Sequence, residues 1–105
     1  HSEAHGGRRE VLSVDDDATN RLLVEQILEP QGYLVVSCSG GAEALKLARA
    51  RSHLPDIVLM DMHMPDMDGL ECARELRAMP DGARVPIICL SADLSEEAAH
   101  EGVRA

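Results

Sequence analysis

Aspartates stand directly after two short, mostly apolar runs of this 105-residue chain. Asp61 follows residues 57–60, and Asp15 and Asp16 follow residues 11–14. Such runs are too short for buried helices and predict buried strands. Because open α/β sheets bind ligands at the carboxyl ends of their strands, we expect these carboxylates to meet at one corner of a sheet. Crowded carboxylates need a cation to offset their repulsion, and oxygen ligands suit Mg²⁺, so the pattern predicts a magnesium site.

A carboxylate held beside a metal ion can attack phosphorus, which makes Asp61 a candidate nucleophile. Another apolar run, residues 86–90, is followed by Ser91. The Ser91 hydroxyl and the backbone N–H of Ala92 could donate hydrogen bonds to a phosphoryl oxygen. Simpler interpretations remain, because residues 15–17 could form only an acidic helix-capping turn and Ser91 could merely end a strand. The position of all these groups after strand-like runs favours one shared site.

Strand-like and helical patterns alternate along the chain. Strands are predicted at residues 9–14, 33–38, 56–61 and 86–91, with helices at about 18–29, 42–51, 70–79 and from 95 onward. This alternation predicts an α/β fold with a doubly wound parallel sheet covered on both faces. In the strand order 2-1-3-4 the first and third strands are neighbours, which places Asp15 and Asp16 beside Asp61.

Apolar residues at helical spacing indicate which face of each predicted helix turns toward the core. The inward positions are expected to be Leu22, Leu23, Ile27 and Leu28, then Ala44, Leu45 and Ala48, then Leu70, Ala73 and Leu76. Asp17 is expected to cap the first of these helices. Asp66 and Asp68 are expected to be turn formers, and the methionines around Asp61 to be packing residues.

The composition excludes several classes of function. With one aromatic residue and a formal charge of −9, the chain offers no stacking platform for bases and repels nucleic acid and anionic lipid. No apolar stretch is long enough to span a membrane. The three cysteines show no metal-binding spacing and are expected to be buried free thiols in a reducing, cytoplasmic compartment.

Three segments together resemble the receiver domain of two-component response regulators. They are residues 11–17, 59–69 and 86–92, in the order and spacing of that family. The resemblance covers about residues 9–105 and implies a flavodoxin-like receiver fold, while residues 1–8 are expected to form a flexible arm or tag remnant. It implies a phosphorelay function, in which the domain itself promotes phosphoryl transfer without being an ordinary enzyme.

The resemblance implies a role for each candidate residue. Asp61 would be the phosphoacceptor, and Asp15 and Asp16 would hold Mg²⁺ with it. The backbone carbonyl of His63 would be a further metal ligand, and Ser91 would contact the phosphoryl group. The expected partner is a histidine kinase or phosphotransfer domain.

A partner would dock on the helix after Asp17, through the positions that the resemblance matches, namely Ala18, Asn20, Arg21 and Val24. The Asn20-Arg21 pair and residues 62–69 resemble most closely the receivers attached to hybrid sensor kinases. The resemblance therefore suggests a receiver that belongs to a longer signalling protein.

The sequence also departs from the family pattern. Receivers continue into a fifth strand that ends in Lys-Pro and into a fifth helix, whereas this sequence ends at Ala105 with Lys46 as its only lysine. We therefore expect weaker phosphorylation, and a degenerate receiver that only mediates assembly is an alternative. Residues 86–90 would form an exposed sheet edge, which predicts self-association. A haloacid-dehalogenase-like phosphatase is a third possibility, disfavoured because His63 stands where that family has a second aspartate.

Overall fold

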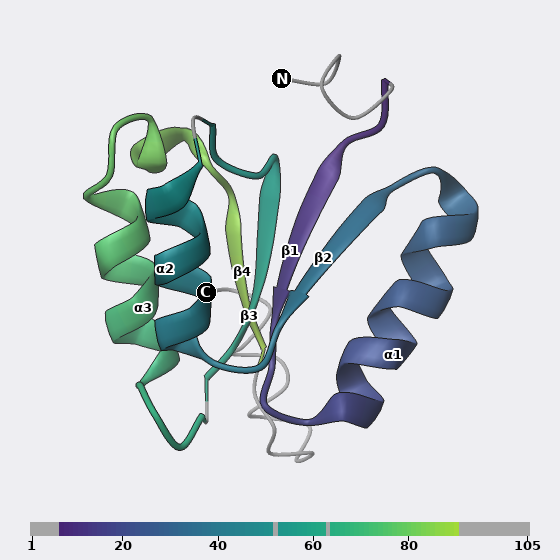
Figure 1. Cartoon of the computed structure of the whole chain (residues 1–105), viewed down its shortest axis with the longest axis horizontal. Coiled ribbons are helices and arrows are strands. Elements are labelled where there is room, and N and C mark those ends of the chain that lie inside the picture. The colour runs from purple at the N-terminus through teal and green to yellow at the C-terminus, as the bar shows by residue number, and fades with distance from the viewer. Residues whose placement is uncertain (1–6, 52, 63, 91–105) are drawn as a thin grey trace.

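Strands and helices alternate through the part of the chain that the computed structural model describes, which is residues 7–51, 53–62 and 64–90 (Figure 1). The elements are β1 (Glu10–Val14), α1 (Ala18–Leu28), η2 (Glu29–Gln31), β2 (Leu34–Cys38), α2 (Gly41–Ala50), β3 (Ile57–Asp61), α3 (Gly69–Arg77), η3 (Gly82–Arg84) and β4 (Ile87–Leu90). The predicted strands and helices are confirmed with small differences at their ends. The helix predicted from residue 95 lies outside the described residues.

The four strands are all parallel and lie in the order β2-β1-β3-β4. This confirms the predicted order and makes β1 and β3 neighbours. Val14 pairs with Met60 at the carboxyl ends of these two strands. Asp15 and Asp61 each follow one member of that pair, so the register brings the two acids to the same edge of the sheet.

Helices cover both faces of the sheet, as a doubly wound fold requires. Figure 1 shows α2 and α3 side by side on one face and α1 on the other. The main core lies between the sheet and the helices α2 and α3, and alternate residues of the strands point into it. Its buried members include Leu12, Val14, Val58, Met60, Ile87 and Cys89 from the strands and Ala44, Leu45, Ala48, Cys72, Ala73 and Leu76 from the helices.

The helix α1 is less buried than its apolar pattern predicted. Leu22, Leu23 and Ile27 are 50%, 49% and 58% exposed, and α1 contains no buried residue. Among the described elements α1 alone covers its face of the sheet, so no neighbouring helix packs against its flank (Figure 1). Leu70 in α3 was also predicted to face the core but is exposed. Cys72, which was not predicted to face the core, is buried in the same helix.

A buried ion pair joins the start of β1 to the loop after α2. Glu10 is 2% exposed at its side chain, and its Oε2 accepts a hydrogen bond of 2.6 Å from Arg51. Arg51 also lies 3.1 Å from Nε2 of His53. Asp56, just before β3, accepts a hydrogen bond from the backbone N–H of Glu10 at 2.7 Å.

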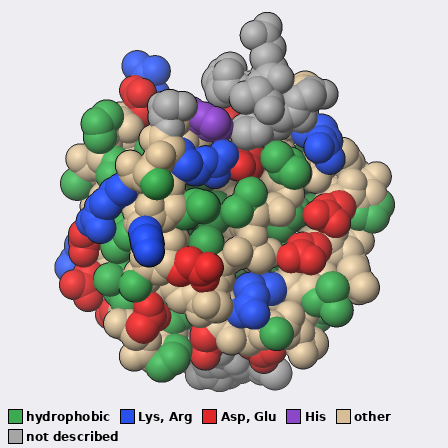
Figure 2. All heavy atoms as spheres, in the orientation of Figure 1, with side chains coloured by type: hydrophobic (Ala, Val, Ile, Leu, Met, Phe, Trp, Pro, Cys, Tyr) green, Lys and Arg blue, Asp and Glu red, His purple; other side chains and the backbone are tan. Residues whose placement is uncertain are grey.

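The surface mixes charges of both signs. On the face that Figure 2 shows, Lys and Arg side chains lie next to Asp and Glu side chains, with hydrophobic groups between them. Among the described helices, none has the length and apolar content needed to cross a bilayer. Cys38, Cys72 and Cys89 are free and buried, as expected from the sequence.

Candidate functional site

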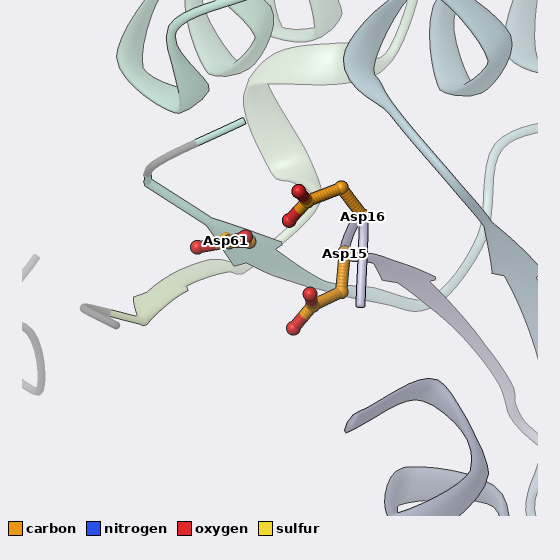
Figure 3. A group of neighbouring side chains, drawn as sticks. All are labelled: Asp15, Asp16 and Asp61. Carbon is orange, nitrogen blue, oxygen red and sulfur yellow. The ribbon is translucent and has the colours of Figure 1, made fainter. Parts of the chain in front are cut away.

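Three carboxylates meet at the carboxyl ends of β1 and β3. Asp15, Asp16 and Asp61 each offer an oxygen, and these oxygens lie within 4.8 Å of one another. Figure 3 shows Asp61 projecting from the end of β3 and the other two side chains projecting from the residues after β1. Asp61 is buried, Asp15 is half-buried and Asp16 is exposed, so the cluster opens to solvent on one side.

The cluster suits a small divalent cation. Mg²⁺ binds oxygen at about 2.1 Å, so two of its ligands lie at most about 4.2 Å apart. The upper limit of 4.8 Å between these oxygens is only slightly greater, and small side-chain rotations would bring all three onto one ion. Carboxylates are hard ligands, which favours Mg²⁺ over thiophilic metals.

Backbone contacts fix Asp15 at the end of β1. Its N–H donates to the carbonyl of Cys38 at 3.0 Å, which ties it to the end of β2. Its Oδ1 accepts a hydrogen bond of 2.9 Å from the N–H of Asp17, and its carbonyl accepts one of 2.7 Å from Arg21. Asp17 caps α1 by accepting from the N–H of Thr19 at 2.8 Å, which confirms the predicted cap. Arg21, predicted only as a docking residue, therefore also braces the acidic turn.

Asp61 is held by β4 and by the start of α3. Asp61 pairs with Leu90 across the sheet, and the N–H of Met62 donates to the carbonyl of Leu90 at 2.9 Å. Gly69 lies so close to this turn that an added Cβ would collide with the backbone carbonyl oxygen of Asp61. The glycine is therefore required by the close approach of α3 to the strand end.

Two acids of the β3–α3 loop do more than form turns. Asp68 caps α3 by accepting a hydrogen bond of 2.9 Å from the N–H of Leu70. Asp66 accepts from the N–H groups of Gly41 and Ala42, at the start of α2. An Asp-Gly before an apolar helical pattern signals the first of these caps. The second joins residues 24 positions apart, and no local pattern announces it.

An open hollow of about 780 Å³ lies beside the acidic cluster. Its lining combines acids with apolar side chains, from Asp16, Met62, Met64, Pro65, Asp68 and Leu70. The packing role predicted for the methionines is confirmed, since Met60 and Met64 are buried and Met62 and Met67 pack against the core. The hollow gives an incoming group access to the acids.

The thiols near this end of the sheet are not suited to the metal. Burial raises the pKa of Cys38 from 9.0 to about 11, and burial with the neighbouring Asp66 raises that of Cys72 to about 11. Both therefore stay protonated at neutral pH, whereas a thiol binds metal as the thiolate. The site consists of oxygen ligands.

A second hollow, of about 610 Å³, lies at the opposite end of the sheet. It is lined partly by Arg49, Arg51 and Arg84. Glu75 pairs with Arg49 at 2.8 Å and Glu10 with Arg51 at 2.6 Å, which neutralises two of the three charges. The hollow is remote from the acidic cluster and carries no comparable concentration of one charge.

The structure therefore brings together three of the residues predicted for the site, Asp15, Asp16 and Asp61. The other three, His63, Ser91 and Ala92, lie outside the described residues.

Comparison with known proteins places the chain in a family. The family model of the response regulator receiver domain matches residues 11–105. The sensory/regulatory protein RpfC of Xanthomonas campestris is 40% identical over 90 residues, which is 84% of this chain and 12% of that protein. The sensor histidine kinase CheAY of Helicobacter pylori is 30% identical over 93 residues, or 89% of this chain and again 12% of the relative. The chain thus spans a small part of these relatives.

Solved structures agree with the fold. The receiver domain of the sensor histidine kinase PA1611 from Pseudomonas aeruginosa, determined with a magnesium ion coordinated in its active site cleft, superposes with a TM-score of 0.75 and 34% identity. The match covers 90% of this chain and 79% of that one. Sequence, strand order and the acids at the strand ends all agree, and the chain belongs to the response regulator receiver domain family.

Proposed function

We propose that Asp61 accepts a phosphoryl group and that Asp15 and Asp16 bind Mg²⁺ with it. The observation that carries this proposal is the convergence of three carboxylate oxygens within 4.8 Å at the ends of β1 and β3. Receiver domains act in phosphorelay signalling, and their acidic pocket binds Mg²⁺. In this chain, Asp61 would accept the phosphoryl group, and Asp15, Asp16 and Asp61 would bind the Mg²⁺.

The proposed transfer uses one Asp61 oxygen as the nucleophile. It attacks the phosphorus of a phosphohistidine, an O–P bond forms, and the N–P bond breaks with its electron pair returning to the imidazole. The product is an acyl phosphate on Asp61. A bound Mg²⁺ would offset the charge of the phosphoryl oxygens during this exchange.

Other residues of the site would orient the carboxylates and contact the metal or the phosphoryl group. Asp15 is held by Cys38, Asp17 and Arg21, so its free carboxylate oxygen is preoriented toward the cluster. We assign the His63 carbonyl to the metal and the Ser91 hydroxyl and Ala92 N–H to the phosphoryl group, on the basis of the family pattern alone.

The proposed partner is a histidine kinase or a histidine phosphotransfer domain. Receiver domains interact with such proteins, and CheAY is itself a sensor histidine kinase. The proposed docking surface is α1, through Ala18, Asn20, Arg21 and Val24, and the open hollow beside Asp16 would give the partner access to the acids. We also propose that residues 9–105 form the receiver unit and that the domain works in the cytoplasm, where its buried free thiols would remain reduced. Most of the predicted N-terminal arm, residues 1–6, lies outside the described residues.

Beryllium fluoride, which mimics a phosphoryl group on a carboxylate, tests the site. We expect amide NMR signals at the ends of β1 and β3 to shift with Mg²⁺, and to shift further when beryllium fluoride is added. Asp61→Asn should lose the second response. A wild-type protein that responds to neither reagent at millimolar Mg²⁺ would favour the degenerate receiver, a module that only mediates assembly.

A further inference from the structure

Asp66 ties the loop after β3 to the start of α2. Its Oδ2 accepts a hydrogen bond of 3.0 Å from the N–H of Ala42, and its Oδ1 accepts a longer one of 3.4 Å from the N–H of Gly41. The first N–H groups of a helix have no partner within the helix. The N-cap residue, Gly40, has no side chain that could accept them. A residue of another loop therefore supplies the cap of α2.

The glycines at the start of α2 leave the space that this contact needs. A Cβ on Gly40 would lie 2.8 Å from Oδ1 of Asp66, and one on Gly41 would lie 3.0 Å from Sδ of Met67. Gly40 has an extended backbone with φ of −173°, which any residue can adopt. Its glycine is explained by the space that Asp66 occupies and not by backbone strain.

The loop that Asp66 holds begins at the acidic cluster. Asp61 ends β3, and residues 64–68 lead from there to α3. Its far end is fixed by the Asp68 cap of α3, and Sγ of Cys72 lies 3.7 Å from the carbonyl of Gly41. The starts of α2 and α3 and the chain that leaves Asp61 therefore form one contact region.

We propose that Asp66 is a positioning residue that holds Asp61 in register with Asp15 and Asp16 by anchoring its loop to α2, and that it couples metal binding to the start of α2. This inference rests on the proposed metal site. It gives Asp66 no contact with the metal or the phosphoryl group, and its effect passes through the two backbone N–H groups of α2.

Three variants separate the cap from the charge. Asp66→Ala removes both the charge and the acceptor, and Asp66→Asn keeps an acceptor oxygen. Asp68→Ala removes the same charge from the same loop, together with the cap of α3, while leaving α2 capped. We expect Asp66→Ala to weaken Mg²⁺ binding by about fivefold or more, the lower end of typical coupling between sites. Asp66→Asn should recover most of that loss, and Asp68→Ala should weaken binding less than Asp66→Ala.

The amide NMR signals of Gly41 and Ala42 provide a second measurement. They should shift when Mg²⁺ is added to the wild type and to Asp68→Ala, and should respond much less in Asp66→Ala. Circular dichroism checks that every variant is folded, and Asp66→Asn supplies the milder test if Asp66→Ala unfolds.

Two outcomes would contradict the proposed role of Asp66, and they have different consequences for the metal site. If wild type binds Mg²⁺ and both Asp66 variants bind it equally well, with unchanged responses of Gly41 and Ala42, the role of Asp66 is refuted while the metal site stands. If the wild type itself does not bind Mg²⁺, the proposed function fails and this inference fails with it.

Discussion

Three negative charges around one point should destabilise the domain when no cation is bound. Replacing Asp61 with Asn removes one charge while keeping the shape of the side chain. Two repulsive pairs, with Asp15 and with Asp16, disappear. We therefore expect Asp61→Asn to be more stable than the wild type in EDTA, although it alters a buried residue at the centre of the site.

The magnitude follows from the separation of the oxygens. At the limiting distance of 4.8 Å, one pair of unit charges repels by about 0.9 kcal/mol in water and by about 3.5 kcal/mol at an effective dielectric constant of 20. Because Asp16 is exposed and Asp15 half-buried, the lower value applies. Loss of two pairs should raise the free energy of unfolding by about 2 kcal/mol, or the midpoint temperature by about 10 °C.

Urea unfolding followed by circular dichroism measures both this gain and its dependence on metal. Mg²⁺ at ten times its Kd should stabilise the wild type by about 1.4 kcal/mol and Asp61→Asn far less. Asp81→Asn is a matched control at the opposite end of the sheet. It makes the same chemical change at a residue with φ of 64°, a conformation that Asn tolerates, so stability should change by less than about 0.5 kcal/mol.

Two results would refute this reasoning. One is an Asp61→Asn variant that is less stable than the wild type in EDTA. The other is equal stabilisation of both proteins by Mg²⁺. Either would show that the three carboxylates do not form a shared, repulsive metal site.

Other expectations concern the rest of the molecule. Arg51→Ala should lower the free energy of unfolding by about 3 kcal/mol, because it leaves Glu10 buried without this partner. Arg49→Ala breaks an exposed ion pair and should lower it by at most about 1 kcal/mol in the same urea experiment. The raised pKa values of Cys38 and Cys72 disfavour the thiolates only in the folded state, so the stability that these two thiols contribute should be constant from neutral pH to pH 9 and fall between pH 9 and about 11. Replacement of both residues by Ala should reduce that decline, and Cys89, whose pKa is also raised by burial, accounts for part of what remains.

The strands and the acidic cluster could be predicted because their signals are local and agree with one another. Apolar runs that end on Asp15 and Asp61 give the strand ends, and the parallel order then places those ends together without further information. The cap of α1 by Asp17 is equally local, since the residue stands just before the helix that it caps.

Other features depend on contacts that the local sequence does not contain. The apolar pattern of α1 predicted a buried face, but burial depends on what covers the flank of the helix, and Ile27 is 58% exposed. The Glu10–Arg51 pair and the Asp66 cap of α2 join residues 41 and 24 positions apart. A charged residue inside a strand and a Gly-Gly pair before a helix hinted that partners were needed, but could not identify them.

The most direct test of the account is phosphorylation of Asp61. The protein, with Asp61→Asn beside it, is incubated with acetyl phosphate in Mg²⁺ and in EDTA, and the intact mass of each is measured. We expect the wild type to gain one phosphoryl group in Mg²⁺, to gain little in EDTA, and the variant to gain none. A wild type that gains no phosphoryl group although it binds Mg²⁺, or a variant that gains as much as the wild type, would contradict the assignment of Asp61 as the phosphoacceptor.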